Sequence, residues 1–249
     1  MPQDDTFLSH LLELRTRLLK CFFIFGAAFC VSYIFSQELF LYLLKPYEKV
    51  MSLKHSLESH RLIYTGVTEA FLVYIKVSLF SALFFTFPYF AYHVWMFMAP
   101  GLYKHEKKIV VPILASTPLL FLMGALFAYY IVFPLAYEFF LAFEVSQPQG
   151  LDIHMETRMS EYLSFVMRLI FAFGLSFELP LLIVILGLLG HLKVEDLKKS
   201  WRYVVVGIFT LSAILTPPDI LSMIALAIPL IVLYAISIIL VYFITKTDS

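Results

Sequence analysis

The chain has 249 residues, of which 61% are hydrophobic and 14% are charged, and its formal net charge is +0. Soluble domains usually contain about 45–50% apolar and roughly 25% charged residues, so this composition excludes an ordinary soluble domain and indicates an integral membrane protein. A net charge of zero gives no global field that would attract nucleic acid, so the positions of the charges carry the information.

The first predicted element is an amphipathic helix over residues 6–20. His10, Glu13, Arg17 and Lys20 recur at spacings of three and four residues, which places them on one face of a helix. Leucine and phenylalanine side chains supply its apolar side. Such a helix can lie in the membrane interface before the chain turns inward.

Six apolar runs follow in chain order and predict six transmembrane helices. Their approximate bounds are residues 18–35, 70–95, 109–135, 162–189, 203–215 and 220–244. The fifth run would be about 20 Å long as a helix, which is short of a hydrocarbon core of about 30 Å. Pro217 and Pro218 end it, so the chain must reverse there.

The fold class expected from this pattern is an all-α integral membrane protein with six transmembrane helices. The fifth span, and in one interpretation the sixth as well, is short. Residues 1–249 are expected to form a single polytopic membrane domain. The polar segment 36–68, which contains Pro46, is expected to hold a short helix near residues 38–44, and residues 136–161 form a second connecting segment.

The lysines and arginines predict the orientation, because cytoplasmic loops carry an excess of them. One side of the membrane collects Arg15, Arg17, Lys20, Lys104, Lys107, Lys108, Lys193, Lys198, Lys199, Arg202 and Lys246. The other side collects Lys45, Lys49, Lys54, Arg61 and Arg158. Both termini and the loop of residues 95–108 are therefore expected in the cytoplasm.

The loop of residues 95–108 contains the most informative acidic residue. Pro100 and Gly101 predict a turn between the second and third spans. Glu106 then lies alone among lysines, close to apolar surface, where a carboxylate is suited to receiving a cation. The alternative is that Glu106 merely offsets its lysine neighbours in a solvated loop.

Three ionisable residues, Glu178, Lys76 and Arg168, lie within the predicted spans, where charge is costly and such groups usually face a partner or water. For Arg168, two turns into the fourth span, the default is that its side chain reaches outward to the interface. Glu178 lies midway along the fourth span, beside Pro180, which frees a backbone carbonyl. It is either a polar contact for a partner helix, a proton-carrying group, or a hydrogen-bonded packing residue. Glu69 lies seven residues before Lys76, and an ion pair or a snorkelling lysine explains both.

The sequence carries no catalytic pattern that we recognise. It contains no H-E-x-x-H, no G-x-S-x-G, no Walker loop and no paired-cysteine zinc pattern. We therefore expect neither an enzyme nor a metal or cofactor site.

Seven short motifs in order resemble the TatC family, the multispanning signal-peptide receptor of the twin-arginine protein translocase. They are HLLELR from His10, Pro46, TEAF from Thr68, Trp95 with PGLYKHE from Pro100, YLSF from Tyr162, SFELP from Ser176 and LTPPD from Leu215. Each motif alone is weak. Together, on a six-span frame, they cover nearly the whole chain.

The resemblance implies a function that composition and spacing alone do not reach. TatC-like proteins recognise the paired arginines of signal peptides on folded proteins, and the proton-motive force drives transport. They assemble with single-span TatA- and TatB-like membrane proteins and with further copies of themselves. The resemblance therefore implies a multi-pass protein of the cell inner membrane.

The resemblance also implies roles for particular residues. The arginine-binding acids are Glu13 and Glu106, and their neighbours in one cytoplasmic patch are Leu12, Arg17, Phe97 and Tyr103. Glu178 matches the intramembrane acid of the family, and the structural or assembly positions are Pro46, Tyr129 and Asp219. The spacing of Glu13 and Arg17 also allows an i,i+4 ion pair, worth a few tenths of a kcal/mol.

A second function class stays open at this point. A secondary transporter of a small solute or ion could use Glu178 and Lys76 in a central cavity. Such a protein should ignore a twin-arginine peptide, whereas a receptor should retain it on purification.

Overall fold

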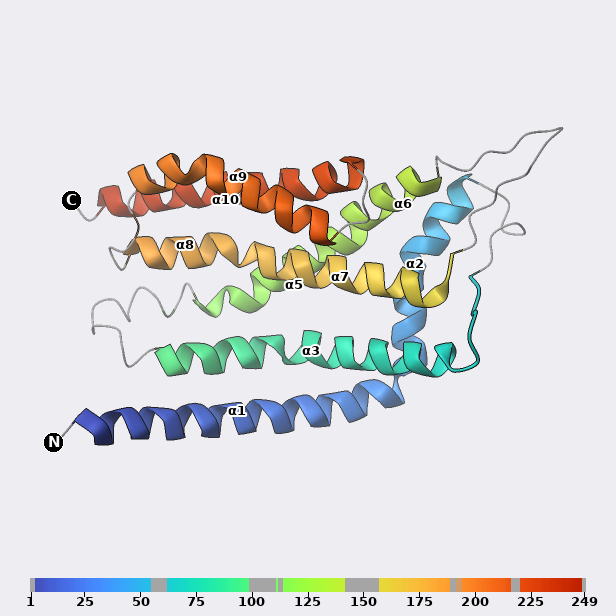
Figure 1. Cartoon of the computed structure of the whole chain (residues 1–249), viewed down its shortest axis with the longest axis horizontal. Helices are drawn as coiled ribbons and strands as arrows, with labels where there is room; N and C mark the ends of the chain where they lie inside the picture. The colour runs from blue at the N-terminus through green and yellow to red at the C-terminus, as the bar shows by residue number, and fades with distance from the viewer. Residues whose placement is uncertain are drawn as a thin grey trace. The chain divides into compact units, whose positions relative to one another are not determined.

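In the computed structural model the chain is helical, and the structure describes residues 3–54, 62–98, 111, 114–141, 157–188, 192, 194–215 and 220–247. Its helices are α1 (Gln3–Ile34), α2 (Ser36–Lys54), α3 (Glu69–Met98), α5 (Thr117–Phe127), the π-helix η2 (Ala128–Val132), α6 (Phe133–Leu141), α7 (Met159–Phe177), α8 (Leu179–Leu188), α9 (Val194–Leu215) and α10 (Ile220–Thr247) (Figure 1). One isolated β-bridge joins Ile63 to Arg158.

Five helical stretches among the described residues are long and apolar enough to cross a membrane. They are Ser9–Ile34, Glu69–Phe97, Thr117–Leu141, Met159–Gly187 and Met223–Phe243. The expected all-helical membrane class is thus confirmed. The helix that contains the expected fifth span, α9, does not qualify because its first turns carry two acidic residues, two lysines and Arg202. The fifth span, and with it the total of six, therefore stays a prediction.

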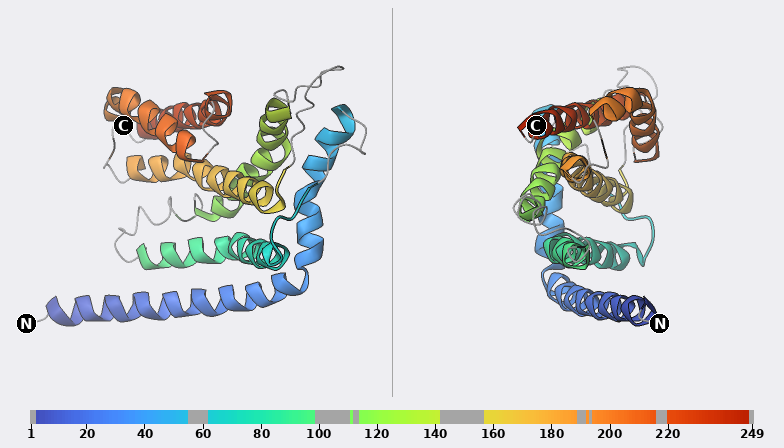
Figure 2. Two further views of the ribbon diagram at one scale, coloured as in Figure 1. Left: turned by 45° about the vertical axis from the view of Figure 1, so that its right-hand side comes forward. Right: turned by 90° about the vertical axis from the view of Figure 1, so that its left-hand side faces the viewer.

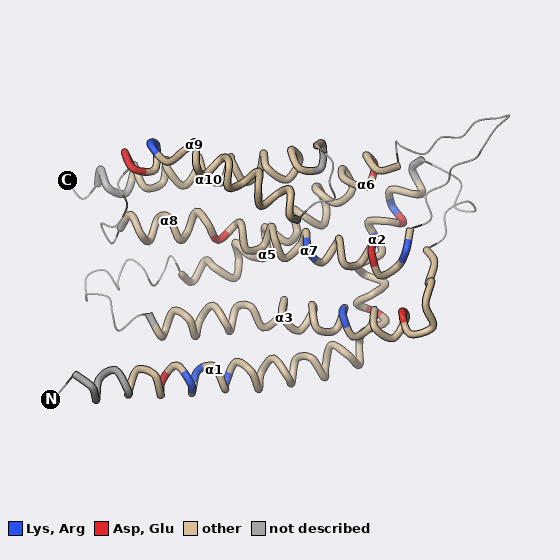
Figure 3. The backbone as a smooth tube through the Cα atoms, viewed as in Figure 1, with Lys and Arg blue, Asp and Glu red and all other residues tan. Residues whose placement is uncertain are grey.

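The helices group into two compact units. One comprises residues 1–40 and 74–118, and the other comprises residues 41–73 and 119–249. In α3 and α9 the charged residues lie near the start of the helix and leave a long uncharged stretch after them, whereas Arg168 and Glu178 lie within the stretch Met159–Gly187 (Figure 3). Long uncharged stretches are what a helix in a bilayer requires, and charged residues inside a span usually face a partner or water.

In the first unit, α1 and α3 lie side by side (Figures 1 and 2). The Ser78 hydroxyl of α3 donates to the Tyr74 carbonyl at 2.7 Å and lies 3.5 Å from the Ser32 carbonyl of α1. Helix α1 is continuous over 32 residues, so the expected turn between an interfacial helix and the first span is absent. No glycine or proline occurs between Gln3 and Phe25 to break it.

In the second unit, α2 continues through Pro46 to Lys54, well beyond the short helix expected near residues 38–44. Proline has no N–H, so it leaves the carbonyl of Tyr42, four residues earlier, without its helical donor. The Tyr129 hydroxyl donates to that carbonyl at 2.5 Å. The Tyr162 hydroxyl donates to the next carbonyl, that of Leu43, at 2.8 Å. Two tyrosines from other helices thus satisfy the backbone at this proline.

Replacing Tyr129 with phenylalanine should therefore lower the free energy of unfolding by about 0.5–1.5 kcal/mol, the net worth of one hydrogen bond. In a Pro46→Ala background the loss should be smaller, because the new N–H of residue 46 can bond the Tyr42 carbonyl. Chemical denaturation of the four proteins in detergent measures this coupling. Equal losses in both backgrounds would show that Tyr129 does not act through this carbonyl.

Close helix contacts in the second unit depend on glycine. A Cβ on Gly124 of α5 would lie 2.5 Å from the Phe173 carbonyl oxygen, and one on Gly174 of α7 would lie 2.6 Å from the Phe121 ring. Small residues of this kind let membrane helices approach closely. Phe173 of α7 and Phe133 at the start of α6 are fully buried.

The Glu69 carboxylate ties the start of α3 to α7 within the second unit. Its Oε2 accepts from the backbone N–H groups of Thr65 and Gly66 and from the Thr65 hydroxyl, at 2.6–3.2 Å. Its Oε1 accepts from the hydroxyl of Ser160 at 2.5 Å and from its N–H at 3.3 Å. These bonds, which local spacing did not suggest, account for Glu69 as a structural residue.

Tyr234 of α10 holds the start of α9. Its hydroxyl donates to the Leu197 carbonyl at 3.0 Å, and its ring lies 5.6 Å from that of Trp201. The two helices lie side by side in both views (Figures 1 and 2). The short apolar part of α9 is therefore anchored through the turns that precede it.

Candidate functional site

The candidate site is built on the N-terminal part of α1, where Glu13 and Arg17 form an ion pair. The Arg17 guanidinium donates to Glu13 Oε1 through Nε at 3.0 Å and through Nη2 at 2.5 Å. The Arg17 side chain is only 17% exposed, whereas that of Glu13 is 37% exposed. The i,i+4 pair allowed by the spacing is therefore formed, and Oε1 is already engaged.

His10 connects this pair to α3. Its Nδ1 lies 3.8 Å from Glu13 Oε2, the oxygen that Arg17 does not hold. Its ring stacks on that of Phe97, with centroids 4.3 Å apart and the two planes 17° apart. His10 was not among the predicted site residues. Its spacing of three from Glu13 was the signal for it, but no local pattern could indicate the contact with Phe97.

The cluster of His10, Glu13, Arg17 and Phe97 thus brings together three of the predicted site residues, one of the two acids and two of the neighbours. Leu12 lies on the same helix and is 59% exposed, which leaves an apolar side chain beside the acidic one. Glu13 Oε2 can accept hydrogen bonds from an incoming cation. The carboxylate would then bind that cation and the Arg17 guanidinium at the same time. Chemically the cluster is suited to a ligand with a positive group next to an apolar one.

Three predicted site residues lie outside the part of the chain that the structure describes. They are Tyr103, Glu106 and Asp219. Their roles stay predictions from the sequence.

Glu178 lies at the break between α7 and α8 and is 8% exposed. Its backbone N–H donates to the Leu175 carbonyl at 3.1 Å, and its own carbonyl accepts from the Leu182 N–H at 3.0 Å. Pro180, two residues later, has no N–H to donate and explains why the helix is interrupted here. The acid is thus buried at a discontinuity inside a stretch that can span the membrane, Met159–Gly187.

The predicted structural positions Pro46 and Tyr129 act together at the carbonyl of Tyr42. The ring of Tyr129 also stacks on that of Tyr42, with centroids 5.4 Å apart. Tyr129 lies in the π-helix η2, in which the Phe133 N–H bonds to the Ala128 carbonyl. Pro134 follows that turn and lacks the N–H that a regular α-helix would use.

Comparisons with known proteins place this arrangement in a family. Residues 9–229 match the family model described as Sec-independent protein translocase protein (TatC). The protein of that name from Rickettsia prowazekii (strain Madrid E) is 46% identical over 240 residues, which are 96% of this chain and 93% of the relative. The one from Escherichia coli (strain K12) is 40% identical over 240 residues, covering 96% of this chain and 89% of that protein.

A solved structure gives the same result for the fold. The crystal structure of the twin-arginine translocase receptor TatC superposes with a TM-score of 0.80 at 36% sequence identity. The match covers 95% of this chain and 99% of the other. The chain is a multi-pass membrane protein and belongs to the TatC family of Sec-independent protein translocase proteins.

Proposed function

We propose that this chain is the receptor and core subunit of a twin-arginine translocase. It binds the twin-arginine signal peptides of folded proteins, and those proteins are then transported across the membrane with the proton-motive force. The chain performs no catalysis of its own. The observation that carries this proposal is the match over nearly the whole chain to the receptor structure, at 36% identity and a TM-score of 0.80. Nothing comparable favours a solute transporter.

The proposed peptide site consists of Glu13 and Glu106 as the arginine-binding acids. Its neighbours are Leu12, Arg17, Phe97 and Tyr103. A guanidinium can bind a carboxylate through two parallel hydrogen bonds, which an ammonium group cannot copy, so an arginine pair is a readable signal. The half-exposed Glu13 beside the exposed Leu12 supports this assignment. The test is whether the detergent-purified protein retains a twin-arginine peptide, which a solute transporter would not.

We assign the protein to the cell inner membrane, with six spans and with both termini and residues 95–108 in the cytoplasm. The uneven distribution of lysine and arginine supports this orientation. In a background without native cysteines, single cysteines at Lys107 and Lys198 should resist an impermeant thiol reagent applied from outside. Cysteines at His55 and Gln149 should react with it. Labelling of residue 107 from outside would contradict the orientation and the site with it.

Its proposed partners are TatA- and TatB-like single-span proteins, further copies of the chain and membrane lipid. Glu178 is the proposed polar contact for a partner helix. Its 8% exposure inside a span supports a hydrogen-bonded role, because an unpaired polar group at that depth is costly.

Glu178→Gln should therefore be mild, since the amide keeps the shape and can still hydrogen-bond. Glu178→Ala should reduce crosslinking to the partner helix, while twin-arginine peptide binding stays at the wild-type level. Site-specific photocrosslinking in membranes, with peptide binding measured on the same preparations, checks both. Complete loss of transport in the glutamine variant would instead indicate an obligatory ionisable group.

A further inference from the structure

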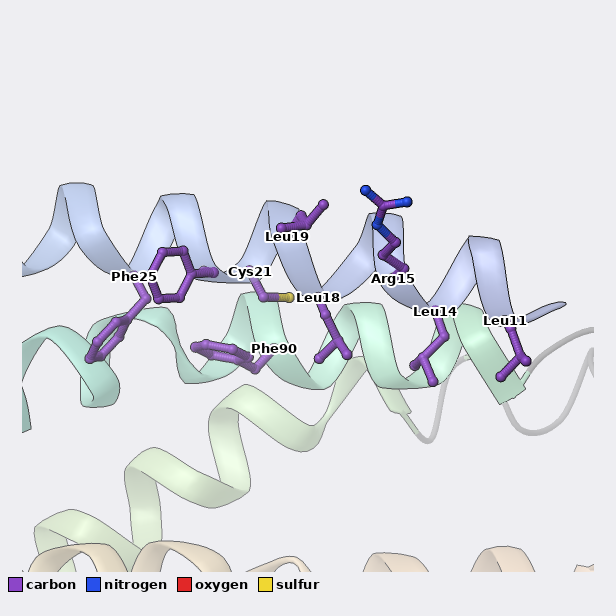
Figure 4. A pocket seen from close by; sticks show the side chains of 9 residues that line it. Leu11, Leu14, Arg15, Leu18, Leu19, Cys21, Phe25 and Phe90 are labelled. Carbon is purple, nitrogen blue, oxygen red and sulfur yellow. The ribbon is translucent and has the colours of Figure 1, made fainter. Parts of the chain in front are cut away.

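An apolar groove runs along α1 in the first unit, beyond the cluster around Glu13. Leu14, Leu18, Cys21 and Phe25 line it from α1, and Phe90 lines it from α3 (Figure 4). Its volume is about 560 Å³, within the range of about 300–1,000 Å³ typical of small-molecule sites. None of these five residues is used by the proposed peptide site.

Arg15 is the one charged residue among those that line the groove. Its side chain is exposed, and it makes no hydrogen bond or ion pair with any residue that the structure describes. Its guanidinium points away from α3, whereas Leu11, Leu14 and Leu18 point toward that helix (Figure 4). The contrast with Arg17, which Glu13 holds, is sharp: Arg15 leaves its positive charge available for an external anion.

The part of the groove between Arg15 and Phe25 matches one leaflet of a bilayer in length. Ten residues separate Arg15 from Phe25, or about 15 Å along a helix. That distance is half of a hydrocarbon core of about 30 Å. The stretch of α1 that can span the membrane continues to Ile34, so the groove occupies only its N-terminal part. A partner's transmembrane helix would instead follow α1 across both leaflets.

We propose that this groove binds one anionic phospholipid, with an acyl chain along Leu14, Leu18, Cys21 and Phe25 and the headgroup phosphate on the Arg15 guanidinium. An apolar channel that runs one leaflet deep from a single charged lining residue suits this ligand. Arginine at this level keeps its charged end at the headgroups while its stem covers apolar surface. The proposal is independent of the peptide-binding function.

The test is lipid binding by the full-length, detergent-purified protein, measured by native mass spectrometry. Phosphatidylglycerol is compared with phosphatidylcholine of the same acyl chains. We expect phosphatidylglycerol to bind more tightly, and Arg15→Gln to weaken its binding about fivefold, as for one basic residue at an anionic surface. Binding of phosphatidylcholine should not change in that variant.

Lys20→Gln is the matched control, because it removes the same charge from an exposed position of α1 that does not line the groove. It should leave phosphatidylglycerol binding within twofold of the wild type.

Leu18→Trp, at an exposed lining position, should weaken the binding of both lipids by filling the groove. A phosphatidylglycerol carrying a photoreactive acyl chain should crosslink to residues 14–25 of the wild type. This measurement tests the position of the acyl chain even if the Leu18→Trp protein does not fold.

Equal losses from Arg15→Gln and Lys20→Gln, or no preference for the anionic lipid, would overturn the proposal. Crosslinks that map outside α1 and the part of α3 around Phe90 would also overturn it. So would a groove that a single-span partner helix occupies in place of the lipid. Twin-arginine peptide binding is measured on the same variants. A failure of lipid binding with normal peptide binding refutes the lipid site alone and leaves the receptor function intact.

Discussion

Replacing Glu106 with glutamine is expected to weaken binding of a twin-arginine signal peptide roughly thirtyfold or more. Removing one member of a hydrogen-bonded charge pair at a partly desolvated interface costs about 2–5 kcal/mol, because the other charge is left without its partner. Glutamine keeps the shape of the side chain and removes only the charge. Fluorescence anisotropy of a labelled peptide, titrated with detergent-purified protein, measures the loss.

Three comparisons bring out the role of charge. Glu106→Asp should retain part of the affinity, and rising ionic strength should lower the affinity of the wild type. Glu13→Ala should weaken binding less than Glu106→Gln, because Glu13 is half exposed and its Oε1 is already held by Arg17. A Glu106→Gln protein that elutes and unfolds like the wild type but binds the peptide normally would exclude Glu106 from the site.

The second large effect concerns the contact between α5 and α7. Gly124→Ala should destabilise the protein by about 1–3 kcal/mol, the usual cost of overpacking a well-packed core. The value should lie toward the upper end, because the obstructing atoms are the backbone oxygen and carbon of Phe173, at 2.5 and 2.9 Å from the added Cβ. A backbone carbonyl inside a helix cannot rotate away as a flexible side chain could.

Gly207→Ala is the control for this substitution within the same unit. A Cβ there would meet nothing within 4 Å, so the only effect is the higher helix propensity of alanine. It should be neutral or stabilising by up to about 1 kcal/mol. Thermal unfolding of both variants in the same detergent gives the comparison. Similar shifts in the two proteins would show that the close approach of α5 and α7 is not what constrains Gly124.

The class of fold could be predicted from the sequence because apolar runs of membrane length leave few alternatives. The course of α2 could not, since Pro46 usually breaks a helix. The hydroxyls that satisfy its backbone come from Tyr129 and Tyr162, which lie 87 and 119 residues from the carbonyls they bind. Only the folded chain brings those groups together, and no local pattern reports such a contact.

The candidate site shows the same division between local and distant contacts. The pair of Glu13 and Arg17 follows from helical spacing, and the structure contains it. The stacking of His10 on Phe97 joins residues of two helices, so periodicity within one helix could not predict it. The assignment of Glu106 depends on the family motif around Pro100 and Gly101, and physical reasoning alone left a solvated loop as the alternative.

The most direct test of the receptor function is discrimination between arginine and lysine by the wild-type protein. A twin-arginine peptide and its twin-lysine variant carry the same charge, and they differ in the planar donor geometry that two carboxylates can hold. We predict that titration with the detergent-purified protein gives at least tenfold tighter binding of the arginine peptide. Equal affinities for the two peptides would contradict the account.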